Sequence, residues 1–211
     1  MLRTVFALLL MTLPVQAKDA RAGDFDYYVM SLSWTPTWCD LTGDARQSSQ
    51  CRSGQGFGFT LHGLWPQYTK GGYPSFCRTP ARNPTRAMSN RMIDIMGASG
   101  LAWYQWKKHG RCSGLNAADY YALARKAYAN VARPEVFRKL KRDIKLPASV
   151  VEAAFMAANP ILRPDQITIT CQSHKIQEVR ICLTKNLELT ECGYDVARDC
   201  KLLDAGMAVI R

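Results

Sequence analysis

Eight cysteines in 211 residues constrain the fold of this chain more than any other feature of its sequence. Such a number is typical of proteins that form disulfides in an oxidising compartment. Eight cysteines can pair in more than a hundred ways, and their spacing narrows the choice only weakly. The arrangement that we favour is Cys39–Cys51, Cys77–Cys112, Cys171–Cys200 and Cys182–Cys192. A zinc site is the weaker interpretation, because closely spaced pairs such as C-x2-C do not occur.

The first 17 residues have the pattern of an export signal, which agrees with the cysteine count. Arg3 precedes an apolar run at residues 5–13, and residues 15–17 (VQA) match the small-residue cleavage pattern. The run is far shorter than the roughly 20 residues that cross a bilayer, so a membrane anchor is disfavoured. We therefore expect a mature chain of residues 18–211, folded as one domain and located in the periplasm or outside the cell.

The order of strand and helix patterns predicts an α+β fold. Strand patterns occur first, then helical patterns, then strand patterns again, which is typical of an antiparallel sheet with helices packed on one side. The predicted strands are 25–34, 57–62, 167–170, 176–183 and 207–210. The predicted helices are 88–96, 101–109, 117–131, 134–141 and 149–158. Ser149 and Glu152 would form a capping box at the start of the last helix.

Positive charge gathers in two stretches that contain no acidic residue. The chain has 28 Lys and Arg against 17 Asp and Glu, a formal net charge of +11. This excess predicts an anionic partner: nucleic acid, an acidic polysaccharide or a membrane surface. The acid-free stretches, residues 66–86 and 101–115, also carry aromatic side chains. Basic groups interleaved with aromatic rings are typical of sites that bind single-stranded nucleic acid.

Two of the three histidines lie beside these stretches and are candidates for moving protons near neutral pH. His62 ends a predicted strand, and His109 ends a predicted helix on the same face as Gln105. Gly110 would stop that helix and leave His109 near an exposed terminus. A single histidine is most often structural, and we interpret His174 in that way.

Both histidine segments resemble the active-site motifs of the T2 family of ribonucleases. Residues 61–66 (LHGLWP) match the first motif throughout, and residues 106–112 (WKKHGRC) match most of the second. The resemblance extends to residues 28–39 and 155–171, and so covers most of the mature chain. It implies an antiparallel sheet with helices, is consistent with the four disulfides above, and implies neither a metal nor another cofactor.

The resemblance also implies a reaction and roles for individual residues. The family cleaves single-stranded RNA by attack of the ribose 2′-OH, which gives a 2′,3′-cyclic phosphate that is then hydrolysed to a 3′-phosphate. By resemblance, His109 is the base, His62 the acid and Lys108 the cation that stabilises the phosphorane. The sequence alone leaves the two histidine roles interchangeable. Trp65 resembles the residue that stacks on a base, with Tyr73 beside it.

Three positions depart from the family pattern. Gln105 stands where a glutamate is usual, so we expect a lower pKa for His109 and an altered rate. Tyr104 stands where a histidine is frequent. Gln67 stands where an acidic residue often contacts the base, which leaves the base preference open.

Two other functions remain to be weighed against a metal-free endoribonuclease. The first is a non-catalytic cationic protein that binds RNA or another polyanion, which Gln105 favours. The second is a metal-dependent nuclease that also acts on DNA, which the acid-free surroundings of the histidines disfavour. We expect RNA as the partner rather than a membrane, and a monomer satisfies every feature of the sequence.

Overall fold

The computed structural model describes residues 20–211, and the predicted export signal lies outside this range. In the described chain, six strands form one sheet in the order β2-β1-β5-β6-β3, with β4 also paired to β5. The strands are β1 (Tyr27–Trp34), β2 (Phe59–Gln67), β3 (Ile144–Leu146), β4 (Ile167–Gln172), β5 (Lys175–Leu183) and β6 (Ala205–Met207). The pairs are antiparallel except for a parallel contact of β5 with β6. The predicted α+β class is confirmed, with a mixed sheet.

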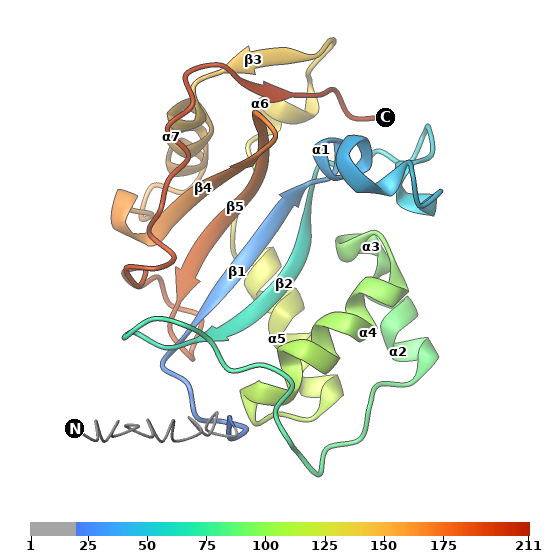
Figure 1. The fold of residues 1–211 in the computed structure, drawn as a ribbon, viewed down its shortest axis with the longest axis vertical. Helices are drawn as coiled ribbons and strands as arrows, with labels where there is room; N and C mark the ends of the chain where they lie inside the picture. Colours follow the sequence, from blue (N-terminus) through green and yellow to red (C-terminus); the bar gives the residue numbers. More distant parts are fainter. Residues whose placement is uncertain (1–19) are drawn as a thin grey trace, which may run out of the picture.

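Helices cover one face of this sheet and leave the central strands open on the other. The helices are α1 (Thr35–Trp38), α2 (Arg86–Asn90), α3 (Ile93–Met96), α4 (Ser99–Lys108), α5 (Ala117–Ala129), α6 (Glu135–Arg138) and α7 (Ala148–Ala158). Met30, Leu32 and Ile181 pack into the main core together with residues of α5 and α7. Figure 1 shows α5 and α7 behind the strands, so that the front of β1 and β5 faces the viewer.

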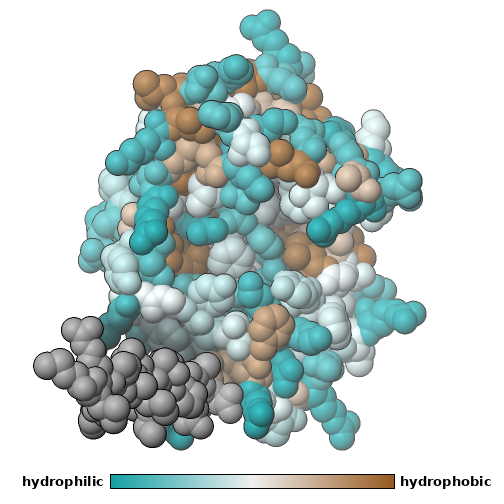
Figure 2. Space-filling model, viewed as in Figure 1, coloured by the Kyte–Doolittle hydropathy of each residue, from teal (hydrophilic) through white to brown (hydrophobic). Residues whose placement is uncertain are grey.

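The open face is mostly polar. Only a small apolar cluster lies on it among the described residues, formed by Tyr27, Val29, Cys182, Cys192 and Val196. Figure 2 shows pale residues of intermediate hydropathy near the middle of this face, between hydrophilic residues. Alternating strand residues therefore place apolar side chains on one side of the sheet and mostly polar side chains on the other. No helix of the described chain is long and apolar enough to cross a membrane.

The predicted strand at 57–62 is too short, because β2 continues to Gln67 and His62 lies inside it. Pro66 is tolerated because β2 is an edge strand, where one side of the backbone has no ladder partner. Ser31 pairs with Gly63 and Leu32 with Leu61, so that His62 is the extra residue of a β-bulge. Bulges often redirect side chains beside functional sites.

Other differences concern short elements. The prediction missed β3 and placed β6 too late, at 207–210, because each of these three-residue strands is defined mainly by its pairing with the other. The predicted helix 88–96 is divided into α2 and α3, and the helix predicted at 134–141 is only α6. The capping box is also wrong: α7 begins at Ala148, whose backbone N–H donates to the carbonyl of Leu202 at 2.9 Å, and no side chain caps it.

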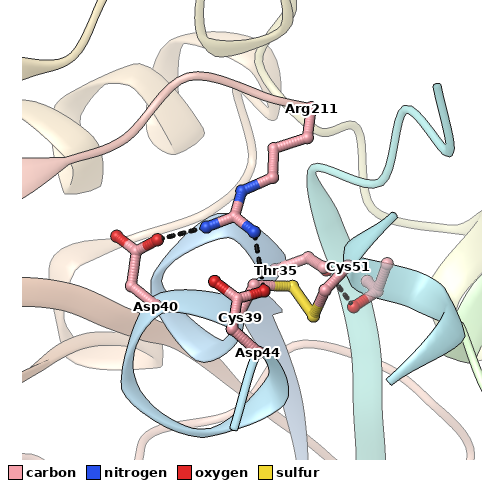
Figure 3. The surroundings of a disulfide bond; sticks show 7 residues. Thr35, Cys39, Asp40, Asp44, Cys51 and Arg211 are labelled. Atoms are coloured by element: carbon pink, nitrogen blue, oxygen red, sulfur yellow. Dashed lines mark hydrogen bonds and ion pairs between the residues drawn. A yellow bond between two sulfur atoms is a disulfide. The ribbon is translucent and has the colours of Figure 1, made fainter. Parts of the chain in front are cut away.

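The eight cysteines form four disulfides in the arrangement that the sequence favoured: Cys39–Cys51, Cys77–Cys112, Cys171–Cys200 and Cys182–Cys192. Cys39–Cys51 closes the segment after α1, where Arg211 donates to Asp40 at 2.5 Å and to Asp44 at 2.7 Å (Figure 3). Cys77–Cys112 ties the loop after β2 to the residues after α4. The segment after α1 and the loop after β2 are thus each held by a disulfide.

Candidate active site

A cleft lies over the open face of the sheet, between β2 and the exposed side of α4. It contains two pockets, of about 320 Å³ and about 540 Å³, which share His62 and Tyr104. All eight residues that the sequence singled out for catalysis or substrate binding line the smaller pocket: His62, Trp65, Gln67, Tyr73, Tyr104, Gln105, Lys108 and His109. The fold therefore gathers His62 and His109, which are 47 positions apart in the chain, around one cavity.

His62 is held by a residue that the sequence analysis did not identify. Its Nδ1 lies 2.5 Å from Oε1 of Glu178, a buried side chain on β5. Burial acts to raise the pKa of Glu178, but the hydrogen bond from His62 and the charge of Arg180 outweigh it and hold the pKa at about 2. An ionised carboxylate only accepts hydrogen bonds, so Nδ1 of His62 carries the proton and Nε2 is left for the cleft.

A signal for Glu178 was present in the sequence. Glu178 and Arg180 are opposite charges two positions apart in the strand, which places both on one face of the sheet. Arg180 donates from Nε and Nη2 to Oε2 of Glu178, at 3.0 and 2.8 Å. Glu178 contacts His62, and Asp195 lines the same pocket. The expectation of acid-free surroundings for the histidines is therefore wrong, because these carboxylates come from the C-terminal part of the chain.

His109 is buried rather than exposed, with 4% of its surface accessible. Burial lowers its pKa to about 3, and the positive charges of Lys108 and His62 act in the same direction. The low pKa agrees in direction with the expectation based on Gln105, but its main cause is burial. Within the described chain, Nδ1 of His109 has no hydrogen-bond partner, so no second residue fixes the tautomer of this ring.

Gly110 does not end α4 in the manner that the sequence predicted. It begins a short 3-10 helix, Gly110–Ser113, and the glycine with a positive φ, of 81°, is Gly114. A Cβ atom on Gly110 would lie 2.6 Å from the ring of Trp106 and 2.8 Å from that of Tyr120. Close packing therefore requires glycine at this position, next to the buried His109.

Trp65 lies close to both histidine rings. Its ring centroid is 5.1 Å from that of His62 and 5.3 Å from that of His109, with which it is stacked. Its Nε1 donates to Oε1 of Gln105 at 2.7 Å. A Cβ atom on Gly63 would collide with both of these polar atoms, which explains the glycine between His62 and Trp65 in the motif.

The remaining candidates form the outer wall of the cleft. The ring of Tyr73 lies 5.6 Å from that of His109, and Nζ of Lys108 lies 5.5 Å from the centre of the Tyr73 ring. The loop that carries Tyr73 is held by a hydrogen bond of 2.7 Å from the backbone N–H of Gly72 to Asp195. In the described chain, no group of three or more His, Cys, Asp or Glu residues is arranged to hold a metal ion.

Comparison with known proteins agrees with this geometry. The sequence profile of the Ribonuclease T2 family matches residues 25–192. A protein named "Ribonuclease" from Aeromonas hydrophila is 44% identical over 110 residues, which cover 52% of this chain and 47% of that protein. Ribonuclease DdI from Dictyostelium discoideum is 25% identical over 206 residues, covering 83% of this chain and 81% of that protein.

The chain thus spans about half the length of the Aeromonas protein. Among solved structures, the RNase-related protein from Calystegia sepium superposes with a TM-score of 0.65 at 22% identity, over 88% of this chain and 97% of that one. A likeness at this identity shows a shared fold. With the profile match over most of its length, the chain belongs to the Ribonuclease T2 family.

Proposed function

We propose that this protein is an endoribonuclease that cleaves single-stranded RNA by attack of the ribose 2′-OH on the adjacent phosphorus. The observation that carries the proposal is that two imidazoles, His62 and His109, both lie next to Trp65 in one pocket that also contains Lys108. This reaction needs one base, one acid and one cation near the reacting phosphate. The family of the chain supports the same activity.

His109 acts as the base in the first step. Because burial lowers its pKa to about 3, the ring is neutral at pH 7 and is able to accept the proton of the 2′-OH. The negative charge of a bound phosphodiester raises the affinity of this ring for a proton. The O2′ atom then bonds to phosphorus while the bond from phosphorus to O5′ breaks.

His62 acts as the acid and gives its Nε2 proton to O5′. The contact of Nδ1 with Glu178 supports this assignment, because an ionised carboxylate stabilises a positive charge on the ring that it contacts. The products are a 2′,3′-cyclic phosphate and a free 5′-OH. In the second step His62, now neutral, takes a proton from water while the water oxygen bonds to phosphorus. The bond from phosphorus to O2′ breaks and His109 returns its proton to O2′, which leaves a 3′-phosphate.

Three further residues support binding and the transition state. The ammonium group of Lys108 stabilises the added negative charge on the phosphorane. Trp65 and Tyr73 provide aromatic faces on which a base can stack, and every base has such a face. DNA lacks the 2′-OH nucleophile, so the mechanism itself selects RNA.

The same proposal includes export of the mature chain, residues 18–211, as one monomeric domain. The four disulfides of the chain support a site of action in an oxidising compartment, either the periplasm or the outside of the cell. Size-exclusion chromatography of the oxidised protein tests whether it is a monomer.

One assay separates this function from the two alternatives. The oxidised protein is incubated with single-stranded RNA and with DNA of matching sequence in EDTA. We expect cleavage of RNA alone, with 2′,3′-cyclic ends, and loss of cleavage in His62→Ala and His109→Ala but not in His174→Ala. Absence of cleavage by the folded protein would support a polyanion-binding protein instead. Loss of activity in EDTA, or cleavage of DNA, would support a metal-dependent nuclease.

A further inference from the structure

We propose that Glu178 is a positioning residue for this reaction, which holds the ring of His62 in one tautomer and one orientation with Nε2 toward the scissile linkage. The inference rests on the proposed function, because it requires His62 to transfer protons to and from RNA. It adds a residue from β5 to a site whose proton-transfer groups, His62 and His109, come from β2 and the end of α4.

The carboxylate of Glu178 is held from both sides. Oε1 accepts from Nδ1 of His62 at 2.5 Å and from the hydroxyl of Ser33 at 3.5 Å. Oε2 accepts from two nitrogens of Arg180 at 3.0 and 2.8 Å. Glu178 is only 3% exposed, so its own side chain is not free to rotate into solvent, whereas His62 is partly exposed and is held by this contact. A group fixed in this way transmits its orientation to His62.

The contact joins two strands that are not neighbours in the sheet. The order β2-β1-β5 places β1 between His62 and Glu178. On β1, Ser33 is paired in register with Glu178 on one side and with Thr60 on the other. Its small side chain leaves space above the strand, and the bulge at His62 displaces the ring from regular strand geometry. The sheet is thus shaped to let an imidazole on the edge strand contact a carboxylate two strands away.

A buried carboxylate is costly unless it is paired, and apolar residues of similar volume often replace buried ion pairs without loss of stability. Stability alone therefore does not explain the carboxylate. Charged and titratable groups face His62 from several elements: Arg46 after α1, Tyr73 in the loop after β2, Tyr104 and Lys108 on α4, His109, Glu178 and Arg180 on β5, and Asp195. Of the described residues, only Glu178 hydrogen-bonds to a nitrogen of the His62 ring.

The test compares Glu178→Gln and Glu178→Ala with the parent protein, and uses Glu188→Gln as a control that removes an exposed carboxylate. We expect kcat to fall on the order of 10²-fold in Glu178→Ala, since well-placed acid catalysis contributes about this much, with little change in KM. The pH–rate profile of both Glu178 variants should differ from that of the parent, because the carboxylate that contacts the acid is removed. Glu188→Gln should behave as the parent.

Two readouts separate positioning from a general structural effect. In a His62→Ala background, Glu178→Gln should cause little further loss of kcat, because groups that act as one unit are not additive. In nitrogen NMR spectra of the free protein, the neutral ring of His62 should carry its proton on Nδ1 in the parent and lose that preference in Glu178→Ala. Glu178→Gln keeps an acceptor and serves where the alanine variant does not fold.

The outcomes distinguish the two proposals. If the parent cleaves RNA but the variants keep its kcat, its pH profile and the His62 tautomer, the positioning role is wrong and the proposed function stands. If both Glu178 variants lose kcat additively with His62→Ala, Glu178 acts on something other than His62 and the positioning role is again wrong. If the folded parent does not cleave RNA, the proposed function fails, and the positioning role fails with it.

Discussion

Acidification should destabilise this protein through His109. Burial lowers the pKa of His109 from 6.5 to about 3, so the folded protein leaves this ring neutral over a range in which the unfolded chain protonates it. The unfolded state then binds more protons, and stability falls as the pH decreases. The contribution of the neutral ring is complete above pH 6.5 and is progressively lost as the pH falls toward 3.

The size of the effect follows from the two pKa values. Between pH 6.5 and pH 4.5, protonation of the unfolded chain at this position lowers the free energy of unfolding by about 2 kcal/mol. For a chain of this length the corresponding fall in Tm is roughly 4 to 8 °C. Glu178, whose pKa is held at about 2, adds its own loss only below about pH 4.5, so it does not disturb this window.

Urea unfolding of the oxidised protein at pH 6.5, 5.5 and 4.5 measures the effect. His109→Asn removes the titrating group, so its free energy of unfolding should vary with pH by about 2 kcal/mol less than that of the parent. His174→Asn is the matched control, because His174 is exposed and its positive φ of 59° suits asparagine. Parallel losses in the parent and in His109→Asn would refute the reasoning.

Two substitutions test the packing and the electrostatics of the second motif. Gly110→Ala should lower the free energy of unfolding by roughly 1–3 kcal/mol, because the new Cβ would lie 2.6 Å from the ring of Trp106. Gly100→Ala, on α4 with open space around it, should leave the free energy of unfolding unchanged. Equal Tm values for the two variants would contradict this account. Gln105→Glu keeps an acceptor for Trp65 and adds a negative charge that raises the pKa of His109. The acidic limb of its pH–rate profile should therefore move to higher pH, and an unmoved profile would show that the charge at this position does not reach the base.

The sequence by itself determined the parts of this protein that depend on residues close together in the chain. Period-two and helical patterns located β1, β4, β5 and α5 nearly within their observed bounds, because burial of one face imposes these periods locally. The two histidine motifs and the residues near them supplied every residue that was expected to line the pocket. Cysteine spacing, although weak, favoured the observed pairing.

Only the tertiary structure decided how these residues act on one another. Glu178 contacts His62 across 116 positions of sequence and over an intervening strand, a distance at which no local pattern carries information. The burial of His109 is likewise a property of the folded chain, and this burial is the main cause of its low pKa. Ionisation follows the solvent access and charges that the whole fold assembles around a group, so a motif names the reactive side chains while the fold sets their protonation.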